Sequence, residues 1–286
     1  MRLTMLLGLL AVLVASPVVA QTPEWREVAP DNLLVIETTK GRILIEMAPD
    51  VAPLHVERVR TLARQGFYDG ITFHRVIDGF MAQTGDPLGT GMGGSELPDV
   101  RGEFVFRRGT EQPYVEVTGS DTAYRRPAGG QLGVYGALPV ATQPDGQMFV
   151  TRDGRVDGTA WFCPGVVGAA RSGQSVDSAN SQFFIMRAPN FSLNGSYTVW
   201  GRVVDGMDTV MLLRSGDPTS GRVPEAERDS MTRVRVASDI PAAERPAVRV
   251  LDPRSARFAQ QVEERRAARG GSFSICDISL PSEVTN

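Results

Sequence analysis

The sequence predicts a mainly β fold, either a barrel or a sandwich with helical caps. Short strand-like runs recur along the chain, and only two or three stretches have a helical pattern. The chain has no internal repeat and no coiled-coil heptad. With 286 residues, 42% hydrophobic and 22% charged, it has an ordinary globular composition and allows one large domain or a domain with an insertion.

The first part of the chain predicts a hairpin followed by a helix. Two β-branched and aliphatic runs, 33–37 and 42–47, flank a turn, as is typical of a hairpin. A helix follows, because Pro53 suits a first helical turn and Gly66 ends the pattern. The apolar stripe of this helix consists of Leu54, Val59, Leu62 and Ala63. His55 is expected on the polar face, as a surface histidine and not a ligand.

A strand and glycine-rich loops come next. Residues 73–81 predict the strand, and the loops cover 85–94. Within them, residues 89–94 match GxGxxG by letter. A dinucleotide site needs a helix directly after those glycines, and the sequence SELP at 95–98 cannot open one. We therefore set the dinucleotide interpretation aside.

Residues 105–161 differ in character from the rest, being polar with many glycines and turn signals. Small hairpins are expected over 131–140 and 147–162, the second turning at Asp153-Gly154. Such a stretch is expected to be an insertion packed on a core, and not an independent domain.

Regular patterns return after the insertion. Strand-like runs cover 165–170, 182–186, 197–203 and 232–237. Residues 207–213 predict a short helix. Residues 252–269 are helix-prone and rich in arginine and glutamate, with Phe258 and Val262 as their few apolar points. A helix with so weak a stripe is expected to dock lightly on the domain.

The first 20 residues resemble a secretory signal. Arg2 gives a positive start, residues 6–14 form an apolar run, and Val18-Val19-Ala20 is a small-residue cleavage site. The run is short and interrupted by Ser16-Pro17, so we prefer a signal peptide to a transmembrane helix. The protein is therefore expected to be exported.

These patterns divide the chain into three parts. A signal peptide covers 1–20, a domain with the insertion at about 105–161 covers 21–241, and a C-terminal extension with a helix covers 242–286. The purpose of the extension does not follow from its sequence.

The two cysteines, Cys163 and Cys276, leave two interpretations open. In an oxidising compartment they pair, closing a loop of about 110 residues and stabilising the fold by up to about 4.7 kcal/mol in the chain-entropy model. Otherwise they are two buried free thiols. Their separation argues against a CxxC redox centre or a zinc knuckle.

The segment 73–86 carries the most chemical information. It contains Arg75, Phe80, Met81 and Gln83. A guanidinium beside an aromatic ring and a thioether suits a ligand that is apolar in body and carries a carbonyl, such as proline within a peptide. No carboxylate pair, thiol nucleophile or metal cluster accompanies it. Alone, the segment also fits a core strand with an incidental surface arginine.

Four motifs, in this order, resemble those of the cyclophilins. They are FHRVIDGFMAQTGD at 73–86, GVVGAARS at 165–172, SQFFI at 181–185 and LNGSYTVWGRVVDGM at 193–207. The likeness covers roughly residues 31–104 and 163–239. It implies an eight-stranded antiparallel closed β-barrel capped by two helices, peptidyl-prolyl cis–trans isomerase activity, and neither a cofactor nor a metal.

The resemblance gives Arg75 the catalytic role. As a prolyl amide twists, its nitrogen gains a lone pair to which a fixed guanidinium donates, and no covalent bond has to break. The apolar pocket for the proline ring is implied to consist of Phe80, Met81, Phe184 and Leu193. Gln83 is implied to hold the substrate backbone.

Other positions follow from the same motifs. Ala170 and Arg171 lie where the family presents backbone to the substrate, and Gln182 is implied to orient the catalytic arginine. Tyr197 stands where many relatives have histidine, and its hydroxyl can still donate to a substrate carbonyl. His74 is expected to be structural and not a general base.

The chain departs from the family in two places. A tryptophan or phenylalanine usually precedes the leucine that matches Leu193, and here Ser192 stands in its place, which argues against strong cyclosporin-type binding. The insertion at 105–161 replaces a short connection. We hypothesise that it lines the substrate groove and narrows peptide choice; the alternative is a surface elaboration without effect on selectivity.

The sequence therefore predicts an isomerase for Xaa-Pro bonds of exported proteins, periplasmic if the source is a Gram-negative bacterium. Its expected partners are proline-containing polypeptides, and we expect a monomer. The net charge of −3 gives no case for nucleic-acid binding, and no later segment predicts stable membrane insertion. The alternative function is a catalytically silent module that binds proline peptides, or a chaperone. A hydrolase is disfavoured, because no GxSxG motif is present.

Overall fold

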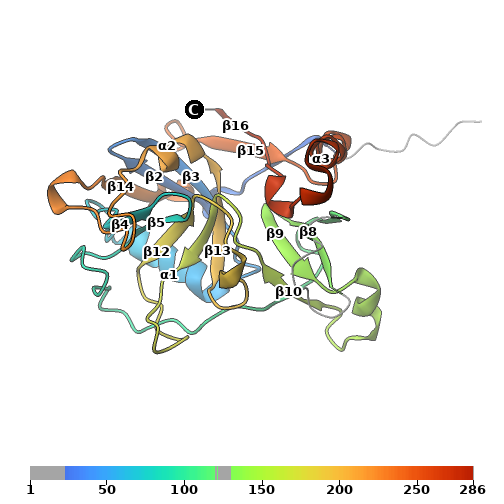
Figure 1. Cartoon of the computed structure of the whole chain (residues 1–286), viewed down its shortest axis with the longest axis horizontal. Coiled ribbons are helices and arrows are strands. Elements are labelled where there is room, and N and C mark those ends of the chain that lie inside the picture. The colour runs from blue at the N-terminus through green and yellow to red at the C-terminus, as the bar shows by residue number, and fades with distance from the viewer. Residues whose placement is uncertain (1–22, 120, 122–129, 286) are drawn as a thin grey trace, which may run out of the picture.

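The computed structural model describes residues 23–119, 121 and 130–285, so the predicted signal peptide lies outside the described residues. Three antiparallel sheets make up the fold (Figure 1). An eight-stranded sheet forms the body, a five-stranded sheet belongs to the insertion, and a three-stranded sheet joins segments from both ends of the chain. The predicted mainly β fold with few helices is confirmed.

The eight-stranded sheet has the order β14-β2-β3-β13-β11-β12-β5-β4. Its strands are β2 (Leu33–Thr38), β3 (Gly41–Met47), β4 (Arg75–Ile77), β5 (Met81–Thr84), β11 (Val166–Ala169), β12 (Phe183–Met186), β13 (Val199–Asp205) and β14 (Met231–Val236). The predicted strand over 73–81 is thus two strands with a turn between them. Gly79 lies in that turn with φ +67°, a conformation that glycine adopts without strain.

The sheet is curled but open, so the expected closed barrel needs a correction. Between the described edge strands β14 and β4 there is no continuous ladder, only the isolated bridges Thr72–Ser230 and Arg75–Arg222. β4 is too short to pair along β14, and the irregular residues just before it bond there instead. The Gly70 amide donates to the Met231 carbonyl at 2.7 Å.

Two helices pack on this sheet, α1 (Pro53–Arg64) and α2 (Met207–Leu212). The prediction for the face of α1 was wrong at two positions, since Leu54 is 42% exposed and His55 only 4%. The cause is Glu103, from a distant segment. Its carboxylate accepts hydrogen bonds from the amides of Leu54 and His55 and from His55 Nδ1 at 2.7 Å. A carboxylate at a helix N-terminus stabilises the first turn, where amides lack partners.

The insertion forms its own sheet, in the order β6-β10-β9-β8-β7. Its strands are β6 (Phe106–Arg108), β7 (Tyr114–Glu116), β8 (Gln131–Tyr135), β9 (Leu138–Thr142) and β10 (Val156–Ala160). β8 and β9 form the hairpin expected over 131–140. The second expected hairpin was wrong, because residues 145–150 form the 3-10 helix η2 and β10 pairs with β9 and β6.

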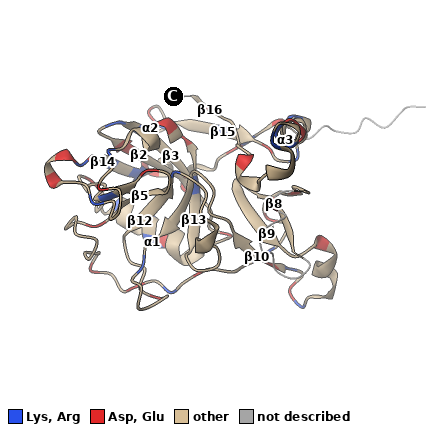
Figure 2. Ribbon diagram, in the orientation of Figure 1, with Lys and Arg blue, Asp and Glu red and all other residues tan. Residues whose placement is uncertain are grey.

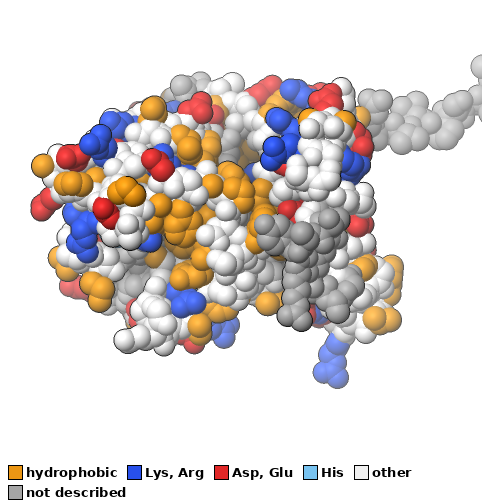
Figure 3. Space-filling model, in the orientation of Figure 1, with side chains coloured by type: hydrophobic (Ala, Val, Ile, Leu, Met, Phe, Trp, Pro, Cys, Tyr) orange, Lys and Arg blue, Asp and Glu red, His pale blue; other side chains and the backbone are white. Residues whose placement is uncertain are grey.

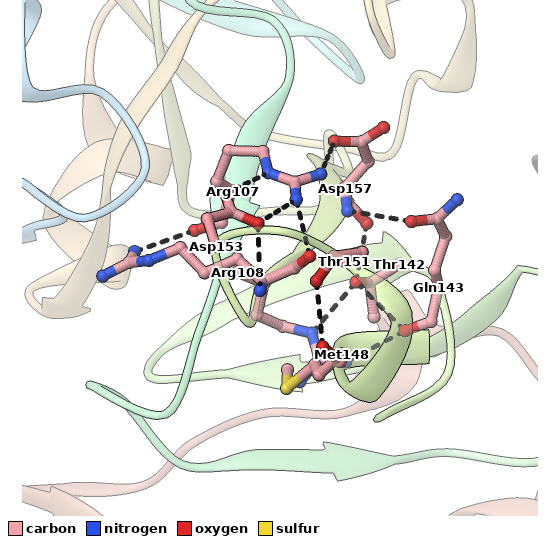
Figure 4. Close-up of polar contacts among 9 residues, drawn as sticks. Arg107, Arg108, Thr142, Gln143, Met148, Thr151, Asp153 and Asp157 are labelled. Carbon is pink, nitrogen blue, oxygen red and sulfur yellow. Dashed lines mark hydrogen bonds and ion pairs between the residues drawn. The ribbon is translucent and has the colours of Figure 1, made fainter. Parts of the chain in front are cut away.

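Arginines fix the far end of the insertion (Figure 4). Arg107 forms ion pairs with Asp153 and Asp157, each at 2.6 Å. Arg108 is almost fully buried and donates to Thr142 Oγ1 at 2.9 Å and to Asp145 at 2.6 Å. A buried guanidinium needs such partners, because an unpaired one is costly.

The C-terminal extension returns to the start of the chain. Strand β1 (Trp25–Glu27) pairs with β15 (Ala247–Leu251), which pairs with β16 (Ser282–Thr285). Between the last two strands lies α3 (Ala256–Arg269), with Ser255 as its N-cap. Only Phe258 and Val262 of α3 are buried, so the predicted light docking is confirmed. Figure 1 shows α3 above the insertion strands β8 and β9.

One hydrophobic cluster joins the three sheets. It combines Val134 and Val140 of the insertion, Phe258 of the extension, and Met81 and Phe184 of the eight-stranded sheet. The insertion is therefore packed on the body, as expected. Its removal would expose a core that the body shares.

Two further links hold the parts together. Cys163 and Cys276 form a disulfide, the first of the two alternatives that the sequence left open. Buried Arg202 of β13 donates to the Ala137 carbonyl of the insertion at 2.9 Å and to the Ile278 carbonyl of the extension at 3.3 Å. Burial lowers the pKa of Arg202 to about 10.

The surface is of mixed charge. In Figure 2 acidic and basic residues alternate along the ribbon, with no large region of one sign. In Figure 3 hydrophobic side chains gather in the middle of this face, over β12 and β13. Within the described ranges no helix is long and apolar enough to cross a membrane.

Candidate active site

Strand register brings three predicted site residues into one row. Arg75 on β4 pairs with Gln83 on β5, and Gln83 pairs with Phe184 on β12. Directly opposed residues of antiparallel strands point to the same face of a sheet. A guanidinium, an amide and an aromatic ring therefore stand side by side.

Arg75 is held by groups on two sides. Its Nε donates to the Ser220 carbonyl at 2.9 Å, and its Nη1 donates to Gln83 Oε1 at 3.2 Å. Met81 Sδ lies 3.7 Å from the same Nη1. Burial lowers the pKa of Arg75, but arginine remains charged at every relevant pH. Among the described residues Nη2 has no hydrogen-bond partner, so a donor is left for a ligand.

A relay of side-chain amides sets the position of Arg75. Gln83 accepts from Arg75 and donates to Gln182 Oε1 at 2.9 Å. Gln182 in turn donates to the Gly93 carbonyl at 2.7 Å. Gln182 therefore contacts Arg75 through Gln83, and not directly.

Asp86 organises the glycine-rich loop at the end of this relay. Its carboxylate accepts from the amides of Leu88 and Thr90, both at 2.8 Å, and from the amide of Gly91. Burial opposes the charged form, but these backbone hydrogen bonds prevail and lower the pKa of Asp86 below its ordinary value. The loop has turns and bends in place of the helix that a dinucleotide site requires.

The predicted proline pocket is assembled from three separate segments. Met81 and Phe184 are buried, and the partly buried Phe80, Leu193 and Tyr197 pack against the same cluster. The rings of Phe184 and Tyr197 meet edge to face, with centroids 5.8 Å apart. An apolar site with one such polar tip suits a small ring attached to a peptide backbone.

Gly168 makes room for this pocket. It lies opposite Phe184 in the β11–β12 pairing. A Cβ at this position would lie 2.5 Å from Phe184 Cζ and 2.7 Å from Phe162 Cε1. Two stacked rings, Phe162 and Phe184, thus occupy the space that any side chain at position 168 would need. Gly168 lies in the GVVGAARS motif, but only the structure shows why a glycine is needed at this position.

Ala170 and Arg171 border the pocket on the side of Gln182. The Ala170 amide donates to the Gln182 carbonyl at 2.9 Å. The Arg171 guanidinium lies over the Tyr197 ring, 4.5 Å from its centroid, and its Nε donates to the Ser196 carbonyl. A cation over an aromatic face is attractive, so Arg171 steadies the tyrosine.

Trp161 at the end of the insertion and Phe162 directly after it support the pocket, a role that the sequence did not reveal. Phe162 accepts from the Asn190 amide at 2.9 Å and donates to Asn194 Oδ1 at 3.0 Å. Trp161 packs on Phe191, with ring centroids 4.9 Å apart. These contacts bracket the 3-10 helix η3 (Phe191–Leu193), which carries the pocket residue Leu193.

His74 is buried beside Arg75 with neither ring nitrogen bonded to a described residue. Burial lowers its pKa, and nearby arginines add to this effect. A neutral, enclosed imidazole is in keeping with the structural role expected from the sequence.

Comparison with known proteins identifies the family. Residues 33–236 match the model of the cyclophilin type peptidyl-prolyl cis-trans isomerase family. A protein of Brucella suis biovar 1, named "Probable peptidyl-prolyl cis-trans isomerase", is 34% identical over 198 residues, which cover 65% of this chain and 74% of that protein.

A solved structure extends the likeness. The crystal structure of a cyclophilin from Hirschia baltica is 35% identical, with a TM-score of 0.77, over 91% of this chain and 93% of that one. This coverage exceeds the family match, so the likeness includes much of the insertion and the extension. With the fold, the motifs and the three comparisons in agreement, the chain belongs to the cyclophilin-type peptidyl-prolyl cis-trans isomerases.

Proposed function

We propose that this isomerase acts on Xaa-Pro bonds of exported polypeptides, with Arg75 as the residue that stabilises the twisted amide. Resonance in a peptide bond imposes a rotation barrier of about 18–20 kcal/mol. A catalyst lowers that barrier if it binds the twisted amide more tightly than either planar form. The chemistry requires a fixed donor beside an apolar pocket and no acid–base group.

The observation that carries the proposal is the way Arg75 is held. Ser220 and Gln83 occupy its Nε and Nη1, and both lie within hydrogen-bond distance. The guanidinium plane is thereby fixed, and Nη2 remains for the amide nitrogen, which becomes an acceptor only as the bond twists. A donor that is fixed before the reaction costs little reorganisation at the transition state.

The pocket supplies the ground-state affinity. Phe80, Met81, Phe184 and Leu193 offer apolar surface to the proline ring. Gln83 already bonds Arg75 and Gln182, and its second N–H and second lone pair are left for the substrate backbone. Tyr197, steadied by Arg171, offers a hydroxyl to a substrate carbonyl.

Export, to the periplasm if the source is Gram-negative, is supported by two observations. The Cys163–Cys276 disulfide suits an oxidising compartment, where such bonds persist. The pattern of residues 1–20 is that of a secretory signal. Fractionation of the source cells, with N-terminal sequencing of the mature protein, tests this part; an intact Met1 on cytoplasmic protein contradicts it.

An isomerisation assay with short prolyl peptides tests the catalytic role. We expect Arg75→Ala to lower kcat/KM by about 10²–10³-fold, the usual loss when one transition-state donor is removed. Arg101→Ala, a change at an exposed arginine outside the site, serves as the control. Wild-type protein that binds the peptide without accelerating isomerisation would leave only the silent binding module.

A further inference from the structure

A groove of about 760 Å³ lies beside the proline pocket. One wall is the segment Pro189–Ser192, which leads directly into Leu193. The opposite wall comes from the C-terminal extension, between Arg269 and Asp277, and Pro164 and Asp121 complete the lining. Among the described residues, the extension supplies the whole of this second wall, from Arg269 to Asp277.

The extension wall is held rigidly. Cys276 is bonded to Cys163, and the Phe273 carbonyl accepts from the Asp121 amide at 3.0 Å. The Asp121 carboxylate accepts from the Ile275 amide at 2.6 Å. Ser274 and Asp277 form a reciprocal capping box around the 3-10 helix η7 (Ile275–Asp277). A preformed wall reduces the ordering cost of binding.

The other wall is shared with the proline pocket. Leu193 contributes to that pocket, and Ser192, its neighbour in the chain, lines the groove. Ser192 is exposed, and its small side chain adds little bulk between Leu193 and the groove. A polypeptide whose proline lies against Leu193 can continue over Ser192 into the groove.

We propose that this groove binds the substrate polypeptide where it leaves the proline pocket past Ser192. The inference rests on the proposed function and adds a subsite to it. Apolar surface comes from Pro164, Pro189 and Phe191, and polar groups come from Asn190 and the neighbouring serines. A mixed lining of this kind suits an extended chain, which presents both side chains and backbone amides.

The charge of the lining makes no strong demand on the occupant. Arg269 forms an ion pair with Asp277 at 3.1 Å, and Asp121 bonds the Ile275 amide. The volume falls within the range of pockets that enclose ligands of a few hundred daltons. The groove is therefore expected to discriminate mainly by length and apolar content of the flanking residues.

The test compares peptides of different length. A four-residue prolyl peptide is assayed beside peptides extended by four mixed apolar and polar residues on either side of the core. For the oxidised wild-type protein we expect one of the two extensions to lower KM by about tenfold, equivalent to about 1.4 kcal/mol of binding. Isothermal titration with the same peptides gives the dissociation constants.

Gly271→Trp blocks the groove in the variant protein. Gly271 lines the groove, and a Cβ there meets no atom within 4 Å, so the change leaves the backbone undisturbed. The variant should lose the gain from the extension while keeping kcat/KM on the four-residue peptide. Ser272→Trp, at the adjacent lining position, should do the same. Ala267→Trp, on the exposed side of α3 outside the groove, is the matched control and should retain the gain.

The outcomes separate this inference from the proposed function. Equal KM values for short and extended peptides, or a full gain in both blocked variants, would overturn the groove assignment while turnover of the short peptide stands. A protein that turns over no peptide would refute the catalytic proposal. In that case the dissociation constants of the extended peptides still decide the groove.

Discussion

Gly168→Ala is the sharpest test of how the proline pocket is built. The added Cβ would lie 2.5 Å from Phe184 Cζ and 2.7 Å from Phe162 Cε1. Carbon atoms in contact prefer about 3.5–4.0 Å, so relief requires a displacement of about 1 Å. Both rings are buried and stacked on each other, with centroids 5.7 Å apart, so a displacement of Phe184 away from position 168 changes the pocket that Phe184 lines.

This displacement has a structural and a catalytic cost. Overpacking a well-filled core by one methyl group costs about 1–3 kcal/mol of stability. A shift of about 1 Å in a group that positions the substrate can reduce the rate by about 10²-fold. We therefore expect kcat/KM for prolyl peptides to fall by about 10–100-fold, with most of the loss in KM because Phe184 binds the ring.

The assay is prolyl-peptide isomerisation on the folded variant, with circular dichroism and thermal unfolding to establish the fold. Gly146→Ala is the matched control, since a Cβ there meets no atom within 4 Å. If Gly168→Ala is folded and keeps the wild-type kcat/KM, Phe184 does not set the geometry of the site. The reasoning from register and close packing would then be refuted.

Three further predictions concern the disulfide, His74 and Arg75. Replacing Cys163 and Cys276 by serine should lower the free energy of unfolding by about 2–5 kcal/mol in urea denaturation, and an unchanged midpoint would contradict a stabilising bond. Because burial lowers the pKa of His74, the unfolded chain binds the proton more readily, so stability should fall as pH drops below about 6.5. In His74→Gln the free energy of unfolding should change less between pH 7.5 and 5.5 than in the wild type. If the two proteins lose stability in parallel over this range, His74 is not the source of the decline. Arg75→Lys keeps the charge but cannot bond Ser220 and Gln83 together, so kcat should fall by about 10²-fold with peptide binding retained; a wild-type kcat would show that charge alone suffices.

The body of the fold could be predicted because its signals are local. Strands such as 33–37 and 42–47 have aliphatic runs bounded by turn residues, and the structure has them within one residue. The four motifs likewise pointed to Arg75 and Phe184 as site residues. In the structure, the strand register places both in one row with Gln83. Short-range patterns were sufficient to predict these strands, and the order of the motifs was sufficient to predict these site residues.

The errors arose where the partner is distant in sequence. His55 was assigned to the surface because no local pattern indicates that its hydrogen-bond partner is Glu103, 48 residues further along the chain. The expected hairpin over 147–162 failed because β10 finds better partners in β9 and β6. Strands β1 and β15 were not predicted, and the ladder between them joins segments more than 200 residues apart in the chain. Hydrogen-bond partners that only the complete fold supplies decide such cases.

The pairing of β1 with β15 also fixes an order of events during folding. A chain that emerges from its amino end offers β1 and Cys163 long before their partners exist, since Cys276 follows Cys163 by 113 residues. The strands of the eight-stranded sheet are all available earlier, and contacts between distant segments form more slowly than near ones. The three-stranded sheet and the disulfide are therefore expected to form after the eight-stranded sheet, and they then hold the two ends of the chain together. In an oxidised molecule, synthesis has therefore passed Cys276 and the extension has reached its place beside Cys163.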